Sequence, residues 1–413
     1  MNAITSTQVS GVEPSRESQP LAGVRLLVMT SGHDVSDPRI YIKQARSLRR
    51  LGARVAIAGA VYKTAPTDVV ILPVSKPGSR VIRFSFQPWK CLWRARREQC
   101  DIIHVHDAEM LMVLPIAKLR WPGAKFVYDV HEDFANLMLI RGWLPNWIRP
   151  AIKFGVDLVE KSLARLADGI VGVTPPLTGR FPNRNKTTAF NYTSRHFFEA
   201  CATVARPPRY REFDVVHLGT LNPKRGAFLC EALTELHRRR PQTRSLIVGI
   251  LTPEIQELLT TKLPRNCTVL GRTDHERLPG LLGNARIGVD VHPWQQPHLQ
   301  VAIPVKVCEY MAAGCAVVCS SMPVLDQVMK EAGVASDIRT IAGGTPGEYA
   351  EAILQVLTHI EAGEDPGARL RIAAAAQMTW ENEADKIAEL YLKMLGPAER
   401  RSRTMHTMEA AQL

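Results

Sequence analysis

A lysine and a glutamate interrupt an otherwise apolar run, IPVKVCEYMAAGCAVVCSS, in the second half of the chain. The pattern predicts a helix from Lys306 to Ala313, ended by Gly314 and followed by a buried parallel strand. Lys306 and Glu309 would then share one helical face near its start. A surface salt bridge between them is the simplest interpretation, and a ligand-binding role is the alternative.

Two further cations favour the binding role. Lys224 and Arg225 precede a glycine in GTLNPKRG, just after a predicted strand, where the start of a helix exposes free N–H groups. A diphosphate needs this combination of positive charge and backbone donors. Glu309, one turn beyond Lys306, could accept hydrogen bonds from ribose hydroxyls. The sequence therefore suggests that these residues hold a nucleoside diphosphate.

Polar residues also end two predicted strands in the first half, in DIIHVHD and VYDVHEDF. In an open parallel sheet, ligands bind beyond the carboxyl ends of the strands, so these positions are functional candidates. They are His104, His106, Asp107, His131, Glu132 and Asp133. The first three could be metal ligands, but the alternation of a strand points His104 and His106 to one face, where no third ligand is nearby in sequence, so we predict no metal.

Strand and helix patterns alternate twice along the chain, and Pro207 and Pro208 separate the two series. This pattern predicts an α/β protein with two Rossmann-like, doubly wound parallel-sheet domains facing a central cleft. The sequence lacks GxxxxGK[ST], GxGxxG and DxD motifs, which argues against a P-loop NTPase, an NAD enzyme and a metal held by a DxD pair.

Composition indicates an intracellular globular protein. Of the 413 residues, 46% are apolar and 22% charged, and the eight cysteines show no CxxC spacing, so we expect reduced thiols. The polar N-terminus lacks the apolar segment of a signal peptide, and no apolar run is long enough to span a membrane. These features predict a cytoplasmic location.

Positive charge is concentrated in the first half. Residues 21–200 contain 27 Lys/Arg against 14 Asp/Glu, a net charge of +13. Two segments, FQPWKCLWRARREQC and RGWLPNWIRPAIKFGVDLVEKSLARL, mix tryptophans with basic residues, a composition typical of membrane-interface segments. We expect peripheral binding to the anionic inner face of the plasma membrane, with a basic soluble surface as the alternative. Nucleic acid is not expected, since no binding motif is present.

Taken together, the motifs GTLNPKRG, PVKVCEYMAAGCAVVCSS, DIIHVHD, VYDVHEDF and TWENEADKIAELYLKML resemble the retaining GT-B glycosyltransferases of family 4, in the subgroup with Lys-x-x-Glu-Tyr-Met-Ala-x-Gly. The resemblance covers about residues 24–396. It implies an acceptor-binding domain at 21–200, a nucleotide-sugar-binding domain at 210–378 and a last helix at 380–396 that returns to the first domain. The polar composition of the two ends predicts a disordered lead-in at 1–20 and a disordered tail at 397–413.

The resemblance also assigns roles to residues. Arg225, with Lys224, and Lys306 would neutralise the diphosphate leaving group, and Glu309 would contact the ribose. His131 matches the histidine near the transferred sugar, with Glu132 beside it. Gly32 falls in the first-strand loop that approaches the phosphates. No cofactor is implied, since the nucleotide sugar is a substrate.

One position departs from the family pattern. Many members carry a glutamate that touches the sugar eight residues before the second one, and Val301 stands there in this chain. The expected reaction is metal-independent, retaining transfer of a sugar to a glycan or a polyprenyl-diphosphate-linked acceptor in bacterial surface polysaccharide synthesis. The alternatives are a nucleotide-sugar epimerase of the same architecture and a degenerate protein that only binds a sugar nucleotide as a partner or scaffold.

Overall fold

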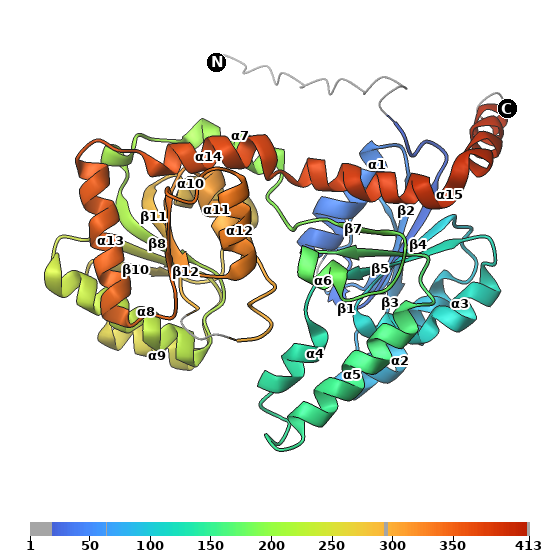
Figure 1. Ribbon diagram of the computed structural model, residues 1–413, viewed down its shortest axis with the longest axis horizontal. Coiled ribbons are helices and arrows are strands. Elements are labelled where there is room, and N and C mark those ends of the chain that lie inside the picture. The colour runs from blue at the N-terminus through green and yellow to red at the C-terminus, as the bar shows by residue number, and fades with distance from the viewer. Residues whose placement is uncertain (1–18, 63, 293–295, 411–413) are drawn as a thin grey trace, which may run out of the picture. The chain divides into compact units, whose positions relative to one another are not determined.

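Two parallel β-sheets with helices on both faces form the framework of the chain in the computed structural model, which describes residues 19–62, 64–292 and 296–410 (Figure 1). The contacts divide the chain into two compact units. One comprises Met1–Tyr128, Leu166–Gly169 and Ile387–Leu413, and the other comprises Asp129–Arg165 and Ile170–Lys386. The predicted α/β architecture with two parallel-sheet domains is confirmed.

The first sheet has seven strands within the described residues. Across the sheet they are β3 (Val70–Val74), β2 (Arg54–Ala60), β1 (Arg25–Asp34), β4 (Ile102–His106), β5 (Lys125–Val130), β6 (Gly169–Gly172) and β7 (Lys186–Thr188). Since β1 lies between β2 and β4, the chain reverses its direction of travel across the sheet at β1 and β4.

Helices connect these strands in the manner that a parallel sheet requires. The label η marks the π-helical and 3-10 segments. The connecting segments are η2 (Pro38–Ala45), α1 (Arg46–Arg50), α2 (Arg80–Ala95), η3 (Ala108–Val113), α3 (Leu114–Arg120), α4 (Phe134–Leu137), η4 (Met138–Ile140), α5 (Arg149–Ala164) and α6 (Pro175–Gly179).

The second sheet repeats this order with six strands in the described part of the chain. They are β10 (Cys267–Leu270), β9 (Ser245–Val248), β8 (Phe213–Leu218), β11 (Ala285–Asp290), β12 (Ala316–Ser320) and β13 (Ile338–Ile341). Successive residues alternate between two apolar cores: Val215 belongs to one and Val216 to the other, as do Val318 and Val317. Each strand is therefore buried on both faces, as its continuous apolar sequence predicts.

One core contains residues of α8 (Pro223–Arg239), α9 (Pro253–Lys262) and α13 (Pro346–Glu361). The other contains residues of α7 (Arg195–Val204), α10 (Leu278–Leu282), α11 (Val305–Ala312), α12 (Pro323–Glu331) and α14 (Pro366–Gln377). The short segments η5 (Pro208–Tyr210) and η6 (His275–Arg277) lie in the connections.

The last helix, α15 (Trp380–Ala410), is broken at Gly396, which has a φ of 66°. The range predicted as a disordered tail, 397–413, is helical to Ala410, and its last three residues lie outside the described part of the chain. The Tyr391 hydroxyl forms a short hydrogen bond with His104 Nδ1 of β4. No helix of the described residues combines the length and apolar character that a membrane span requires.

Tyr310 fixes α11 against the centre of the second sheet. Its hydroxyl accepts a hydrogen bond from Leu218 N of β8 at 2.7 Å and donates to Val289 O of β11 at 3.2 Å. Its ring covers Gly288, where a Cβ atom would lie 2.2 Å from the ring carbon Cγ. The glutamate and lysine of the opening motif are on the same short helix, so this contact also sets their position.

Replacing Tyr310 by phenylalanine should lower the free energy of unfolding by about 1–3 kcal/mol, because a buried N–H loses its acceptor. Chemical denaturation followed by fluorescence measures the loss. Tyr210→Phe is the matched control, since Tyr210 is 62% exposed. Equal stability of the two variants would contradict the role assigned to the Tyr310 hydroxyl.

Candidate functional site

The candidate site lies where the second sheet reverses its strand order, at β8 and β11. Strands in such a sheet lead away from this point on either side, so their carboxyl ends leave room for a ligand. Gly219 follows β8 directly, and Asp290 is the last residue of β11. The helices that follow, α8 and α11, bring Arg225 and Lys306 to the same end.

Asp290 is the centre of the charged cluster. Its buried carboxylate lies 2.9 Å from Lys306 Nζ, 2.8 Å from His292 Nδ1 and 3.6 Å from Arg225 Nη2. Burial alone would raise the pKa of this carboxyl group, but Lys306, His292 and Arg225 together hold it well below its ordinary value. Asp290 is therefore ionised at neutral pH.

Arg225 is held in place by the start of α8. The Asn222 side chain caps this helix by accepting a hydrogen bond from Arg225 N at 2.9 Å. The guanidinium donates from Nε to Val291 O at 3.0 Å and from Nη1 to Thr220 O at 3.3 Å. Its Nη2 is buried and makes no hydrogen bond within the described residues. Asp290 Oδ1, at 3.6 Å, is beyond hydrogen-bond distance from this nitrogen, so Nη2 can still donate to a ligand oxygen.

Lys306 is buried to a degree unusual for a lysine, with 14% of its side chain exposed. Burial lowers its pKa, and the Asp290 carboxylate opposes that effect. Its ammonium lies against Gly219, where a Cβ atom would be 3.2 Å from Nζ. Gly219 has a φ of 116°, so a side chain there would strain the backbone and displace the ammonium.

Lys306 and Glu309 have different ion-pair partners. Lys306 pairs with Asp290, whereas Glu309 Oε1 lies 3.3 Å from Nε2 of His275 in η6. The simplest interpretation of the motif, a surface salt bridge between Lys306 and Glu309, is therefore wrong. Glu309 is 8% exposed. Lys224, by contrast, is exposed in the first turn of α8.

The charges of the cluster do not cancel. One carboxylate, Asp290, faces two cations, Lys306 and Arg225, and a histidine. His217 is buried beside them and stays neutral, since burial and the nearby Lys306 lower its pKa well below the ordinary value. The site thus has surplus positive charge and a guanidinium nitrogen without an acceptor, an arrangement that suits a polyanion.

The first sheet has a second cluster at its own reversal point, β1 and β4. Asp107 follows β4 with an unusual φ of 70°, and its Oδ2 accepts hydrogen bonds from Thr30 Oγ1 and from the N–H groups of Ser31 and Gly32 at 2.7–3.0 Å. The predicted Gly32 N–H is therefore already bonded within the protein. The Arg83 guanidinium lies against Gly32 and would be 2.1 Å from a Cβ atom there.

Two cations complete this second cluster. His33 Nδ1 lies 2.9 Å from Asp107, and Arg83 Nε donates to Glu109 at 2.9 Å. The hydrogen bond to Asp107 raises the pKa of His33 to about 9, so this histidine is protonated at neutral pH. Burial raises the pKa of Glu109, with the Asp107 charge adding to the effect.

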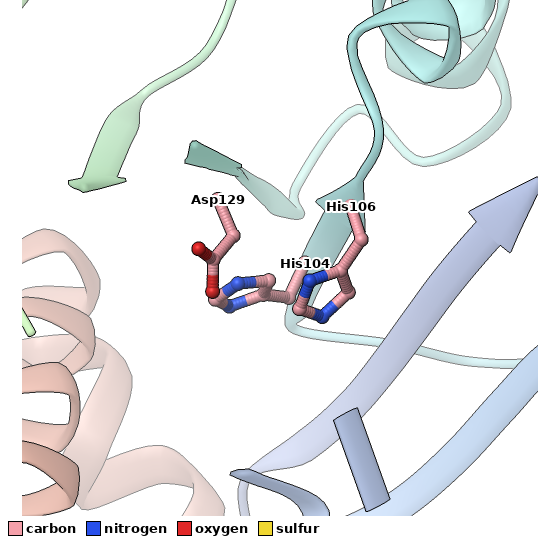
Figure 2. A group of neighbouring side chains, drawn as sticks. All are labelled: His104, His106 and Asp129. Carbon is pink, nitrogen blue, oxygen red and sulfur yellow. The ribbon is translucent and has the colours of Figure 1, made fainter. Parts of the chain in front are cut away.

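The predicted residues His131 and Glu132 follow β5. His131 Nε2 lies 3.5 Å from Asp129 Oδ1, and Glu132 is exposed. In the same sheet, His104 and His106 of β4 and Asp129 of β5 offer ligand atoms within 4.8 Å of one another (Figure 2). Sequence reasoning missed this third side chain because it comes from the neighbouring strand. The Tyr391 hydroxyl bonds to Nδ1 of His104, which leaves Nε2 as the metal-ligating atom of that ring.

Sequence comparison identifies the enzyme class. Residues 39–181 match the sequence model of the family described as Glycosyltransferase Family 4, and residues 212–359 match that of Glycosyl transferases group 1. Together the two models cover most of the chain. The chain is a glycosyltransferase. No curated protein is similar enough in sequence to give a match.

Solved structures show that this glycosyltransferase has the GT-B fold. Sucrose-phosphate synthase from Thermosynechococcus elongatus superposes with a TM-score of 0.66 at 16% identity, over 89% of this chain and 98% of that one. HepE from Anabaena, in complex with UDP, gives 0.64 at 14% identity over 89% and 99% of the two chains. An α,α-trehalose-phosphate synthase (UDP-forming) from Burkholderia vietnamiensis gives 0.62 at 11% identity over 89% and 99%.

The residue that sequence reasoning missed in the glycosyltransferase is Asp290. A signal for it exists, because Asp-Val-His occurs both at the end of β5 and at the end of β11. In each case the histidine pairs with the aspartate two residues earlier, as His131 does with Asp129 and His292 with Asp290. Residues 293–295, which follow His292, lie outside the described residues.

The raised pKa of His33 is directly testable. In an NMR titration of its imidazole, the wild type should give a pKa of about 9, and Asp107→Asn should return it toward the ordinary 6.5. The reason is that the Asp107 hydrogen bond and charge favour the protonated ring. Asp101→Asn, which removes the partner of Arg25 before β4, serves as control and should leave His33 unchanged. The same pKa in all three proteins would contradict the assignment.

Proposed function

We propose that this glycosyltransferase moves a sugar, with retention of configuration and without a metal ion, from a nucleoside-diphosphate sugar to a glycan or lipid-linked acceptor. The reaction would take place at the inner face of the plasma membrane, in the synthesis of a surface polysaccharide. The observation that carries the proposal is the cluster of Arg225 and Lys306 around Asp290 at the reversal point of the second sheet.

The cluster has what a diphosphate leaving group requires. Lys306 is a compact cation with three N–H donors, and Arg225 keeps one nitrogen without a hydrogen-bond partner among the described residues. Structures of HepE with UDP and with UDP-glucose, which share this fold, support a nucleoside-diphosphate donor for this chain. Glu309, which lies one turn beyond Lys306 on α11, is suited to accept hydrogen bonds from the ribose hydroxyls.

In the proposed reaction, the bond between the anomeric carbon and the diphosphate oxygen breaks, and its electron pair leaves with the diphosphate. The acceptor oxygen forms the new bond on the same face, and its proton passes to the departing diphosphate. Charge develops on the leaving group in the transition state, where Lys306 and Arg225 are already fixed to stabilise it. We assign His131 to orienting the donor sugar or acceptor hydroxyl, together with Glu132, and Gly32 and Lys224 to the margins of the phosphate site.

Binding of nucleotides tests the proposal most directly. Calorimetry with UDP, GDP, ADP, dTDP and CMP, and with their sugar conjugates, should show binding of one nucleoside diphosphate. Lys306→Ala should weaken that binding roughly 10- to 100-fold, because a charge-assisted contact to phosphate is lost. Lys330→Ala, at an exposed lysine of α12, is the control.

The outcome separates the alternatives. Absence of nucleotide binding, or equal binding by the wild type and Lys306→Ala, would refute the diphosphate site. An altered sugar nucleotide formed without acceptor would indicate an epimerase instead. Binding without turnover on any acceptor would indicate a partner protein that has lost activity, for which Val301 in the family's glutamate position is the supporting feature.

The membrane part of the proposal rests on exposed aromatic residues among basic ones. On α2, Phe86, Trp89 and Trp93 are 58%, 42% and 67% exposed and share a helical face. No acidic residue occurs from Arg80 to Arg97. In the other compact unit, the segment around α5 exposes Trp143 by 56% and Trp147 by 82%. Tryptophans beside basic residues favour an anionic lipid surface.

Replacing Trp89 and Trp93 together by serine should therefore reduce sedimentation of the protein with phosphatidylglycerol vesicles at low salt several-fold, because apolar insertion is lost. Ile372→Ser is the matched control, since Ile372 is 72% exposed on α14, a helix that packs against the second sheet. This variant should sediment with the vesicles as the wild type does. Failure of the wild type to bind these vesicles would refute membrane association and would leave the donor site unaffected.

A further inference from the structure

Asp290 places a carboxylate in the site that we propose for a diphosphate. Among the described residues it is the carboxylate that forms ion pairs with both Lys306 and Arg225. Placing a negative charge beside a diphosphate weakens the attraction between cluster and ligand. The position of Asp290 at the end of the buried strand β11 therefore requires an explanation other than direct ligand binding.

The surroundings of Lys306 supply that explanation. From β8 it faces His217, from α8 Arg225, from its own helix Glu309, and from β11 Asp290 with the following His292. Burial and Arg225 both favour loss of the ammonium proton, and His217 is neutral. Asp290, whose carboxylate lies 2.9 Å from the ammonium, is the strongest of the influences that keep Lys306 charged, and Glu309 adds a weaker one.

We propose that Asp290 is a positioning residue for donor binding, which keeps Lys306 charged and fixed beside Arg225 while no diphosphate is present. The inference rests on the proposed function of the site. One carboxylate is enough for this purpose and leaves positive charge in excess for the ligand. Asp290 engages one side of the ammonium, whose remaining donors stay available to phosphate oxygens.

The geometry also explains why the carboxylate is rigid. The backbone of β11 places Asp290 between β8 and β12, and its second oxygen is held by His292 Nδ1 at 2.8 Å. The backbone of His292 is itself fixed, because its backbone N–H donates to Ser320 Oγ at 2.6 Å. An ammonium held by such a carboxylate has little freedom to turn away when the ligand leaves.

The test compares the pH dependence of pyrophosphate binding in the wild type and in Asp290→Asn, an isosteric change that removes the charge. Inorganic pyrophosphate is the probe because it needs no knowledge of the base or sugar. Titration calorimetry should give similar or tighter binding by the variant near about pH 6.5, and relative weakening of roughly tenfold or more by about pH 9, as the unsupported lysine loses its proton. Taking the ratio of the two affinities at each pH cancels the titration of pyrophosphate itself.

Two further variants separate positioning from general damage. Asp214→Asn removes a different carboxylate, on β8, which pairs with Arg286. This variant should bind pyrophosphate as the wild type does at every pH. In Asp290→Asn/Lys306→Arg, the guanidinium stays charged without help, so the relative loss at high pH should disappear. If Asp290→Asn does not fold, this double variant is compared with Lys306→Arg, and equal affinities across the pH range are expected.

Each outcome is decisive. A wild type that does not bind pyrophosphate would overturn both the diphosphate site and the role of Asp290. Binding by wild type and Asp290→Asn with the same pH dependence would overturn the role of Asp290 alone, as would a double variant that binds much more weakly than Lys306→Arg at all pH values.

Discussion

The reversal of strand order at the centre of each sheet is the constraint on which both polar clusters depend. Where the chain turns from one side of a parallel sheet to the other, two neighbouring strands send their following segments in opposite directions. In the second sheet this happens at β8 and β11, and the segments that follow return through α8 and α11. Tyr310 secures the arrangement by bonding to both strands.

Both sheets of the glycosyltransferase place a carboxylate among cations at the reversal point. In each sheet, a carboxylate stands at the end of the fourth strand in chain order: Asp107, with a side chain 3% exposed, directly follows β4, and the buried Asp290 is the last residue of β11. Asp107 binds the end of β1 and pairs with His33, whereas Asp290 pairs with Lys306 and His292. Cationic side chains surround both carboxylates. They hold the pKa of Asp107 and the pKa of Asp290 below the ordinary value for a carboxyl group despite burial.

The two clusters differ in charge balance, and this difference explains why we place the donor site in the second sheet. In the first sheet, the carboxylates of Asp107 and Glu109 face Arg83 and His33, so acids and cations are matched. The N–H groups of Ser31 and Gly32 are also bonded to Asp107. In the second sheet a single carboxylate, Asp290, forms ion pairs with Lys306 and Arg225 and lies beside a histidine, which leaves an unbalanced charge for a polyanionic ligand.

Local sequence determined the elements and the types of residue in the site. Apolar strands of the expected length, the helix that ends at Gly314 and the cations at the helix starts follow from patterns within a few residues, which depend little on the rest of the chain. Only the tertiary structure decided which charges meet. Glu309 pairs with His275 rather than Lys306, and Lys306 pairs with Asp290, because strand order brings the ends of separate elements together. Sequence spacing carries no record of that order, so the carboxylate that holds the cluster could be recognised only once β8 and β11 were seen side by side.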